Sequence, residues 1–100
     1  MTLHGIEIPS ERIEGLCRAN GIRRLALFGS VLRDDFRPES DIDVLVEFQP
    51  GVQVGLAFIG MQDELSAILG HKVDLHTPGT LSKYFRDRVL HEAEALYVAA

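Results

Sequence analysis

The sequence predicts an α/β (α+β) domain, a small sheet flanked by helices. Short aliphatic runs, which are typical of strands, alternate with longer segments whose apolar residues recur at helical spacing. Glycine or proline stands at most junctions between these segments, where the chain has to turn. A length of 100 residues leaves room for one such domain.

The first half of the chain predicts one helix and two strands. The helix begins at Pro9-Ser10, with Ser10 as its N-cap, and ends at Asn20-Gly21, where glycine can adopt the left-handed conformation. Residues 25–28 are apolar without alternation, so we expect a short strand buried on both faces. Residues 41–48 alternate apolar and polar side chains, which predicts a second strand with one buried face.

The second half predicts two helices and a third strand. A helix over about 54–69 carries an apolar stripe and ends at Gly70. Residues 72–76 form the third strand, and a helix follows over about 81–92. The tail 95–98 either extends this last helix or forms a short edge strand.

Composition excludes several classes of function. Fifteen acidic against ten basic residues give a net charge of −5, which argues against a nucleic-acid or anionic-membrane surface. The single cysteine, Cys17, excludes an intramolecular disulfide and a multi-cysteine zinc site, and we expect it to be a core residue. The longest nearly apolar stretch, residues 54–61, is too short to cross a bilayer. We therefore expect a cytoplasmic protein.

Two aspartates, Asp41 and Asp43, stand two residues apart at the start of the second strand. On a strand such residues point the same way, about 6.5 to 7 Å apart. Their carboxylates then repel by about 2 to 2.5 kcal/mol at an effective dielectric constant of about 20. A divalent cation removes this repulsion, and oxygen ligands suit Mg²⁺. If the third strand lies beside the second in register, Asp74 completes the carboxylate set of a two-metal phosphoryl-transfer site.

Gly29-Ser30 supplies a complementary feature at the end of the first strand, with ten residues between Ser30 and Asp41. Glycine lets the backbone approach a phosphate closely, while exposed N–H groups and the serine hydroxyl can hold its oxygens. One half of the pattern therefore predicts metal binding, and the other half predicts phosphate binding.

Four neighbouring residues have two interpretations each. Arg33 either steadies nucleotide phosphates or pairs with nearby acidic side chains. Ser40 either caps the turn that leads into the aspartate pair or touches substrate. Lys72 and His76 share the face of Asp74 and are either solvated neighbours or contacts to phosphate or acceptor.

Phe28-Gly29-Ser30 and, ten residues later, Ser40-Asp41-Ile42-Asp43 resemble the GS…DxD signature of the DNA polymerase β-type nucleotidyltransferase superfamily. The chain is similar to its smallest branch, the minimal nucleotidyltransferases that act as MntA-type antitoxins beside HEPN-domain toxins. The similarity runs over about residues 10–97. We therefore expect residues 1–100 to form a single minimal nucleotidyltransferase domain.

The resemblance implies a mixed α/β nucleotidyltransferase fold that uses two Mg²⁺ ions and a nucleoside triphosphate, ATP. It implies that the carboxylates that bind metal and carry the catalysis are Asp41, Asp43 and Asp74. The residues expected at the nucleotide are Gly29, Ser30, Arg33 and Ser40. In this branch the acceptor is a hydroxyl, typically of a tyrosine, on a HEPN-domain toxin encoded nearby, and AMP blocks it.

Two other functions remain compatible with the motif. One is an antitoxin that neutralises its partner by contact without catalysis, and the other is an adenylyltransferase that acts on a small molecule. A nucleotide-sugar glycosyltransferase also uses Asp-x-Asp for metal, but it needs a larger domain and does not explain Gly29-Ser30. The chain has no Walker lysine motif and no nucleophile-elbow serine.

Overall fold

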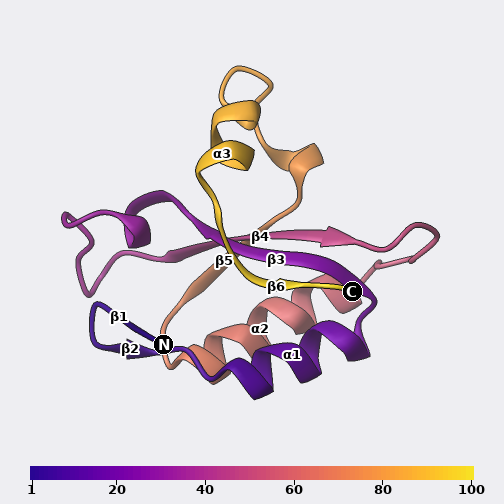
Figure 1. Ribbon diagram of the computed structural model, residues 1–100, viewed down its shortest axis with the longest axis horizontal. Coiled ribbons are helices and arrows are strands. Elements are labelled where there is room, and N and C mark those ends of the chain that lie inside the picture. The colour runs from indigo at the N-terminus through magenta and orange to yellow at the C-terminus, as the bar shows by residue number, and fades with distance from the viewer.

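A four-stranded mixed sheet with two helices along one face forms the body of the protein in the computed structural model, which describes residues 1–100 (Figure 1). The strands are β1 (Thr2–Leu3), β2 (Ile6–Glu7), β3 (Ile22–Phe28), β4 (Ile42–Phe48), β5 (Val73–His76) and β6 (Glu94–Val98). The helices are α1 (Ser10–Ala19), α2 (Ala57–Leu69) and α3 (Arg86–Glu92), with the 3₁₀ turns η1 (Gly29–Leu32) and η2 (Pro78–Thr80). No helix combines the length and the apolar character that crossing a membrane requires.

The strand order β5-β4-β3-β6 brings three strand ends together at one place. β4 runs antiparallel to β3 and parallel to β5, and helix α2 supplies the crossover that a parallel pair needs. The register sets Phe28, the last residue of β3, opposite Asp43, and Asp43 beside Asp74. The expected mixed sheet, with the third strand next to the second, is therefore confirmed.

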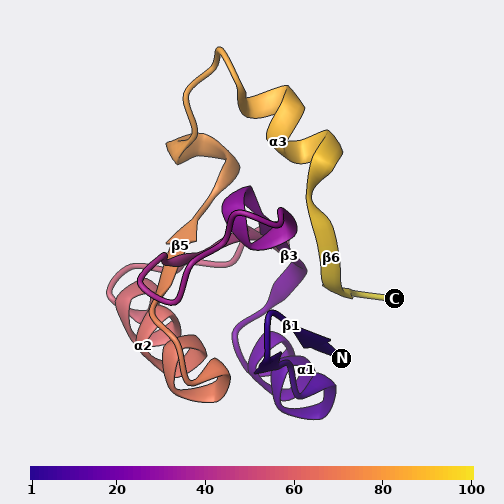
Figure 2. The same ribbon diagram turned by 90° about the vertical axis from the view of Figure 1, so that its left-hand side faces the viewer.

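Helices α1 and α2 cover one face of the sheet and bury the main core. Figure 2 shows both helices on one side of the strands and α3 on the other. The core side chains of the two helices are Ile13, Leu16, Cys17, Met61, Leu65 and Leu69. Burial raises the pKa of the Cys17 thiol to about 12, so this residue stays neutral and acts as a core residue, as predicted.

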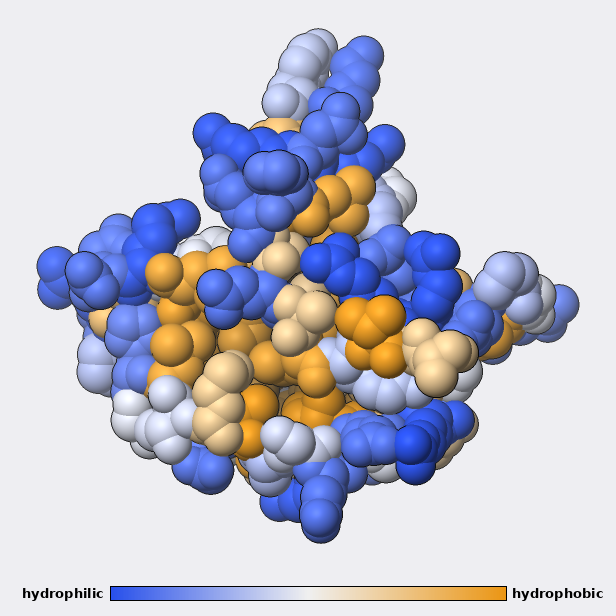
Figure 3. All heavy atoms as spheres, in the orientation of Figure 1, coloured by the Kyte–Doolittle hydropathy of each residue, from blue (hydrophilic) through white to orange (hydrophobic).

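The opposite face carries the aspartates and is only partly covered. Phe28, Leu45 and Leu81 form a small second cluster there, on which α3 packs. Hydrophilic side chains coat α3, whereas apolar side chains gather around the edge strand β6 on the face shown in Figure 3. The exposed apolar residues of this region include Met1 and Val98.

Two helix starts and one N-cap differ from the sequence-based expectations. Pro9, not Ser10, is the N-cap of α1, because the Pro9 carbonyl already accepts the Ile13 N–H at 3.0 Å; the prediction for Ser10 was wrong. α2 begins at Ala57 rather than near residue 54, because Gly55 has a left-handed φ of +49° that breaks the helix.

The last helix is shorter than expected and begins at Arg86, not near Leu81. Leu81 is extended, and its carbonyl accepts a hydrogen bond from the Arg86 guanidinium at 3.0 Å instead of a helical N–H. The tail forms edge strand β6, which is one of the two outcomes the sequence left open. The first predicted strand, β3, starts three residues earlier than expected, at Ile22.

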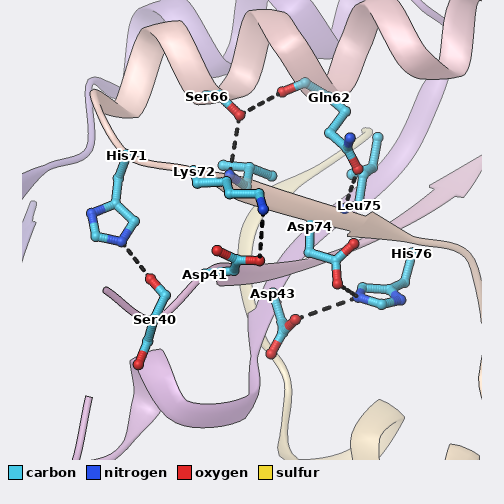
Figure 4. Close-up of polar contacts among 11 residues, drawn as sticks. Ser40, Asp41, Asp43, Gln62, Ser66, His71, Lys72, Asp74, Leu75 and His76 are labelled. Atoms are coloured by element: carbon cyan, nitrogen blue, oxygen red, sulfur yellow. Dashed lines mark hydrogen bonds and ion pairs between the residues drawn. The ribbon is translucent and has the colours of Figure 1, made fainter. Parts of the chain in front are cut away.

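Side chains of α2 hold the outer edge of β5, the strand that carries Asp74. Ser66 Oγ accepts the Val73 N–H at 3.1 Å, and Gln62 Oε1 accepts the Leu75 N–H at 3.0 Å (Figure 4). These outward N–H groups have no neighbouring strand, so the helix satisfies them and closes the edge.

We predict that Ser66→Ala lowers the free energy of unfolding by about 1 kcal/mol, because the Val73 N–H loses its acceptor and this loss outweighs the gain in helix propensity. Urea denaturation measures the change. The control is Glu64→Ala on the exposed face of the same helix, with an expected effect within about 0.5 kcal/mol. Equal effects of the two substitutions would contradict this role of Ser66.

Candidate active site

The end of the sheet where β3, β4 and β5 meet carries a cluster of two carboxylates and an imidazole. His76 Nε2 lies 3.1 Å from Asp74 Oδ2 and 3.4 Å from Asp43 Oδ1 (Figure 4). One ligand atom from each of the three residues lies within 4.8 Å of the other two. The strand register therefore places Asp43 beside Asp74, as predicted from the sequence, and His76 belongs to the same cluster.

Asp41 lies just before β4 and has its own partner. Lys72 Nζ is 3.7 Å from Asp41 Oδ2, and the Lys72 carbonyl accepts the Ile42 N–H at 2.9 Å. The segment before β5 is thereby fixed to the segment before β4. The three predicted carboxylates lie on one side of the sheet end (Figure 4), and Lys72 contacts one of them.

This arrangement destabilises the ionised form of Asp43. Burial raises the pKa of Asp43 above its ordinary value, and the charges of Asp74 and Asp41 raise it further, whereas His76 lowers it. The ionised carboxylate is thus unfavourable in the metal-free protein. Two half-exposed carboxylates on adjacent strands, with a third close by, are the oxygen donors that a divalent cation requires, so the residues present fit such an ion.

Gly29, from the glycine-serine turn, lies against Asp43, from the aspartate pair. Its φ of +77° lies in the left-handed region, and a Cβ added to it would lie 2.6 Å from Asp43 Oδ2. Glycine leaves room for the Asp43 carboxylate against the end of β3, whereas a Cβ there would force this carboxylate to shift. Ser30 follows as the second residue of η1, partly exposed at the same end of the sheet.

His71 holds the end of the loop that connects Ser30 to Asp41. Because a carbonyl only accepts, His71 Nε2 donates the 2.6 Å hydrogen bond to the Ser40 carbonyl, directly before Asp41. The Phe36 ring lies between His71, at 5.4 Å, and His4 of the N-terminal hairpin, at 4.9 Å between centroids. The Ser40 hydroxyl accepts the Arg37 N–H at 3.4 Å within the turn.

Arg33 pairs with none of the three predicted site carboxylates. It forms an exposed ion pair with Asp35, at 3.3 Å, and it lines a cavity of about 540 Å³ that borders Gly29. The other residues of this cavity are Phe28, Leu32, Phe85, Arg88, Val89, Glu92 and Glu94. The structure thus places the carboxylates and Gly29 together and puts Arg33 on the adjoining cavity.

The chain matches the model of the nucleotidyltransferase domain family over residues 10–96. It belongs to this family. Protein adenylyltransferase MntA of Thermococcus cleftensis is 36% identical to this nucleotidyltransferase over 93 residues, which cover 92% of this chain and 93% of the relative. The family named from the motif is therefore confirmed, and so is the class of enzyme.

Two solved structures share the fold of this nucleotidyltransferase. A toxin-antitoxin structure with AMP-PNP has a TM-score of 0.71 at 23% identity, with coverage of 92% of this chain and 75% of that one. A complex of a tri-AMPylated HEPN toxin of Shewanella oneidensis with an MNT antitoxin has a TM-score of 0.62 at 24% identity, with coverage of 90% and 70%. These likenesses confirm the predicted fold.

Three residues at the site were missed or underrated by the sequence reasoning. His76 carried an ordinary alternative as a solvated neighbour, although it contacts both Asp43 and Asp74. His71 and Gln62 act on backbone groups, so their roles depend on tertiary contacts that have no sequence signature. The one available signal was the position of His76, two residues after Asp74 on the same strand face.

We predict that Gly29→Ala destabilises this nucleotidyltransferase more than Gly51→Ala does. Gly51 has a φ of +84° with nothing within 4 Å of an added Cβ, so its substitution isolates the backbone cost of about 1 to 2 kcal/mol. At Gly29 the contact with Asp43 adds to this cost. Urea denaturation compares the two variants, and the excess should shrink in an Asp43→Ala background. Equal losses at both glycines would refute the contact.

We predict that Asp43→Asn raises the unfolding temperature of the metal-free protein at pH 7. A folded-state pKa above the unfolded value means that stability is greatest below the unfolded pKa and is lost as the pH rises through the folded pKa. Removing the charge abolishes this loss, so the difference from the parent should narrow as the pH falls toward about 4. Thermal unfolding with and without chelator measures it. The exposed Asp63→Asn serves as control, and a lower unfolding temperature for Asp43→Asn at pH 7 would contradict the account.

Proposed function

We propose that this nucleotidyltransferase transfers AMP from ATP to a hydroxyl, that of a tyrosine, on a HEPN-type toxin encoded nearby, and so acts as its antitoxin. The observation that carries the proposal is the contact of the phosphate-motif glycine, Gly29, with Asp43, which stands level with Asp74. This contact supports a triphosphate site directly against a carboxylate cluster. The relative named MntA is a protein adenylyltransferase, and the related structures are a toxin-antitoxin with AMP-PNP and a tri-AMPylated HEPN toxin in complex with an MNT antitoxin.

The cavity beside Gly29 is the proposed site of ATP. Gly29 and Ser30 would hold the β- and γ-phosphates with their backbone N–H groups and the serine hydroxyl. Arg33 and Arg88 offer guanidinium groups for phosphate on a wall that also carries Glu92 and Glu94, and the Phe85 ring offers an aromatic face. Ser40 would act indirectly, because its backbone fixes the entry into Asp41.

The proposed site holds Mg²⁺ through Asp41, Asp43 and Asp74. Two such ions, when bound, would neutralise charge on the triphosphate and favour ionisation of the acceptor hydroxyl. The hydroxyl oxygen attacks the α-phosphorus, and the bond from this phosphorus to the oxygen that bridges to the β-phosphorus breaks. Pyrophosphate leaves with the bond electrons, AMP remains on the acceptor, and the hydroxyl proton passes to the Asp74 carboxylate.

A protein acceptor agrees with the charge of the chain. The net charge of −5 repels a nucleic acid, whereas a protein can present a single hydroxyl at the half-exposed carboxylates. Asp74, whose side chain is about half exposed, is more accessible than Asp43, the other carboxylate that contacts His76. This exposure suits a group that meets the acceptor. The HEPN toxin of the related complex carries three AMP groups, which supports transfer to a partner of this class.

We predict that the HEPN-domain protein encoded next to this chain gains one or more AMP masses when incubated with the chain, ATP and Mg²⁺. Intact-mass spectrometry measures the gain. Asp43→Asn should slow the transfer at least about a hundredfold, because it removes a charge that organises the triphosphate site. The matched control is Asp63→Asn, the same chemical change on the exposed side of α2, which should leave the rate unchanged.

The alternative is an antitoxin that acts by contact alone. It would be indicated by a stable complex of the partner with both the parent and the Asp43→Asn chain, without any gain of mass. Incubation of the same protein with ATP and candidate small-molecule acceptors, in the absence of partner, would test a small-molecule adenylyltransferase.

A further inference from the structure

We propose that His76 is a ligand of the divalent cation and gives this site a preference for Mn²⁺ over Mg²⁺. The inference rests on the proposed function, because it concerns the same cation site. It adds a nitrogen donor to a set of carboxylates and thereby specifies the class of metal ion that the site takes.

The first observation is an unsatisfied ring nitrogen. His76 Nε2 is buried and has no hydrogen-bond partner, although it lies 3.1 Å from Asp74 Oδ2 and 3.4 Å from Asp43 Oδ1. Buried polar atoms in folded proteins are almost always hydrogen-bonded or bound to an ion. The Phe28 ring packs against the imidazole in a T-shaped arrangement, with centroids 5.3 Å apart.

The spacing of the donor atoms is the second observation. Neighbouring ligands on one cation with bonds of about 2.1 Å lie about 3.0 Å apart in octahedral geometry and about 3.4 Å apart in tetrahedral geometry. The distances from His76 Nε2 to Asp74 and to Asp43 fall at these values. All three donors lie within 4.8 Å of one another, so one ion can reach them together.

The other interpretations of His76 fit the structure less well. A direct contact with phosphate or acceptor does not explain why Nε2 lies against Asp74 Oδ2 and Asp43 Oδ1. An ion pair of protonated His76 with the aspartates would be stronger with a hydrogen bond along N–H, but neither carboxylate contact has the geometry of a hydrogen bond. A cation between the three groups accounts for both the burial and the spacing.

The donor set determines the metal preference. Mg²⁺ binds almost wholly through oxygen, whereas Mn²⁺ accepts carboxylates and also tolerates an imidazole nitrogen. A donor set of two carboxylates and one imidazole therefore favours Mn²⁺ over Mg²⁺. Without His76, the remaining ligands would be oxygens that suit the two ions alike.

The test is pulsed electron paramagnetic resonance of the full chain loaded with Mn²⁺ alone, which detects an imidazole nitrogen bonded to the ion. We expect nitrogen modulation in the parent and in His91→Asn, a matched change at an exposed histidine on α3, and none in His76→Asn or His76→Gln. Competition of Mg²⁺ against bound Mn²⁺ should show the Mn²⁺ preference falling at least about tenfold in both His76 variants, since even an outer-shell partner is worth that much.

The outcomes separate this inference from the proposed function. Mn²⁺ that binds and is displaced by Mg²⁺, but shows no nitrogen modulation, would overturn the role of His76 and leave the carboxylate site intact. Modulation that persists in both His76 variants would overturn it as well. Failure of the parent chain to bind either ion would overturn both the inference and the proposed metal-dependent transfer.

Discussion

The partial burial of a carboxylate, Asp43, that a second carboxylate flanks is the constraint on which the site depends. Burial of Asp43 is the main cost of its charge, and the parallel register adds repulsion because it places Asp43 beside Asp74. Each neighbouring feature maintains this unfavourable arrangement in the absence of an ion. Gly29 leaves space for the Asp43 carboxylate, and the side chains of Gln62 and Ser66 keep β5 at the sheet edge.

The rest of the fold positions two segments beside Asp43 and Asp74: the loop between β3 and β4, and the segment between β5 and α3. The crossover through α2 makes β4 and β5 parallel, so both strands begin at the end of the sheet where β3 finishes. His71 fixes the end of the first loop through the Ser40 carbonyl, while α3 and the residues before it close a cavity beside Gly29. The proposed phosphate site at Gly29 and the carboxylate cluster therefore share one boundary, which is the arrangement that nucleotidyl transfer requires.

Much of this could be predicted from local sequence patterns. The strand that carries Asp41 and Asp43 and the glycine-serine turn are local features with a specific spacing, and the pairing of Asp74 followed once the third strand was placed beside the second. Helix starts were less predictable: the conformation of Gly55 delays α2, and the Arg86 guanidinium replaces a helical N–H at Leu81.

The contacts of single polar side chains could not be predicted in the same way. Arg33 had a phosphate and a surface ion pair as alternatives; the structure gives it Asp35 as partner and also sets it on the cavity wall. His71 bonds a carbonyl 31 residues away, and His76 meets carboxylates of two strands. Such partners depend on the assembled sheet, not on residue spacing.

The most direct test of the account is the anomalous diffraction of crystals grown with Mn²⁺ and AMP-PNP. The account predicts an anomalous peak bonded to both Asp43 and Asp74, with the triphosphate on Gly29 and Ser30; a nucleotide bound elsewhere, or a peak away from these carboxylates, would contradict it.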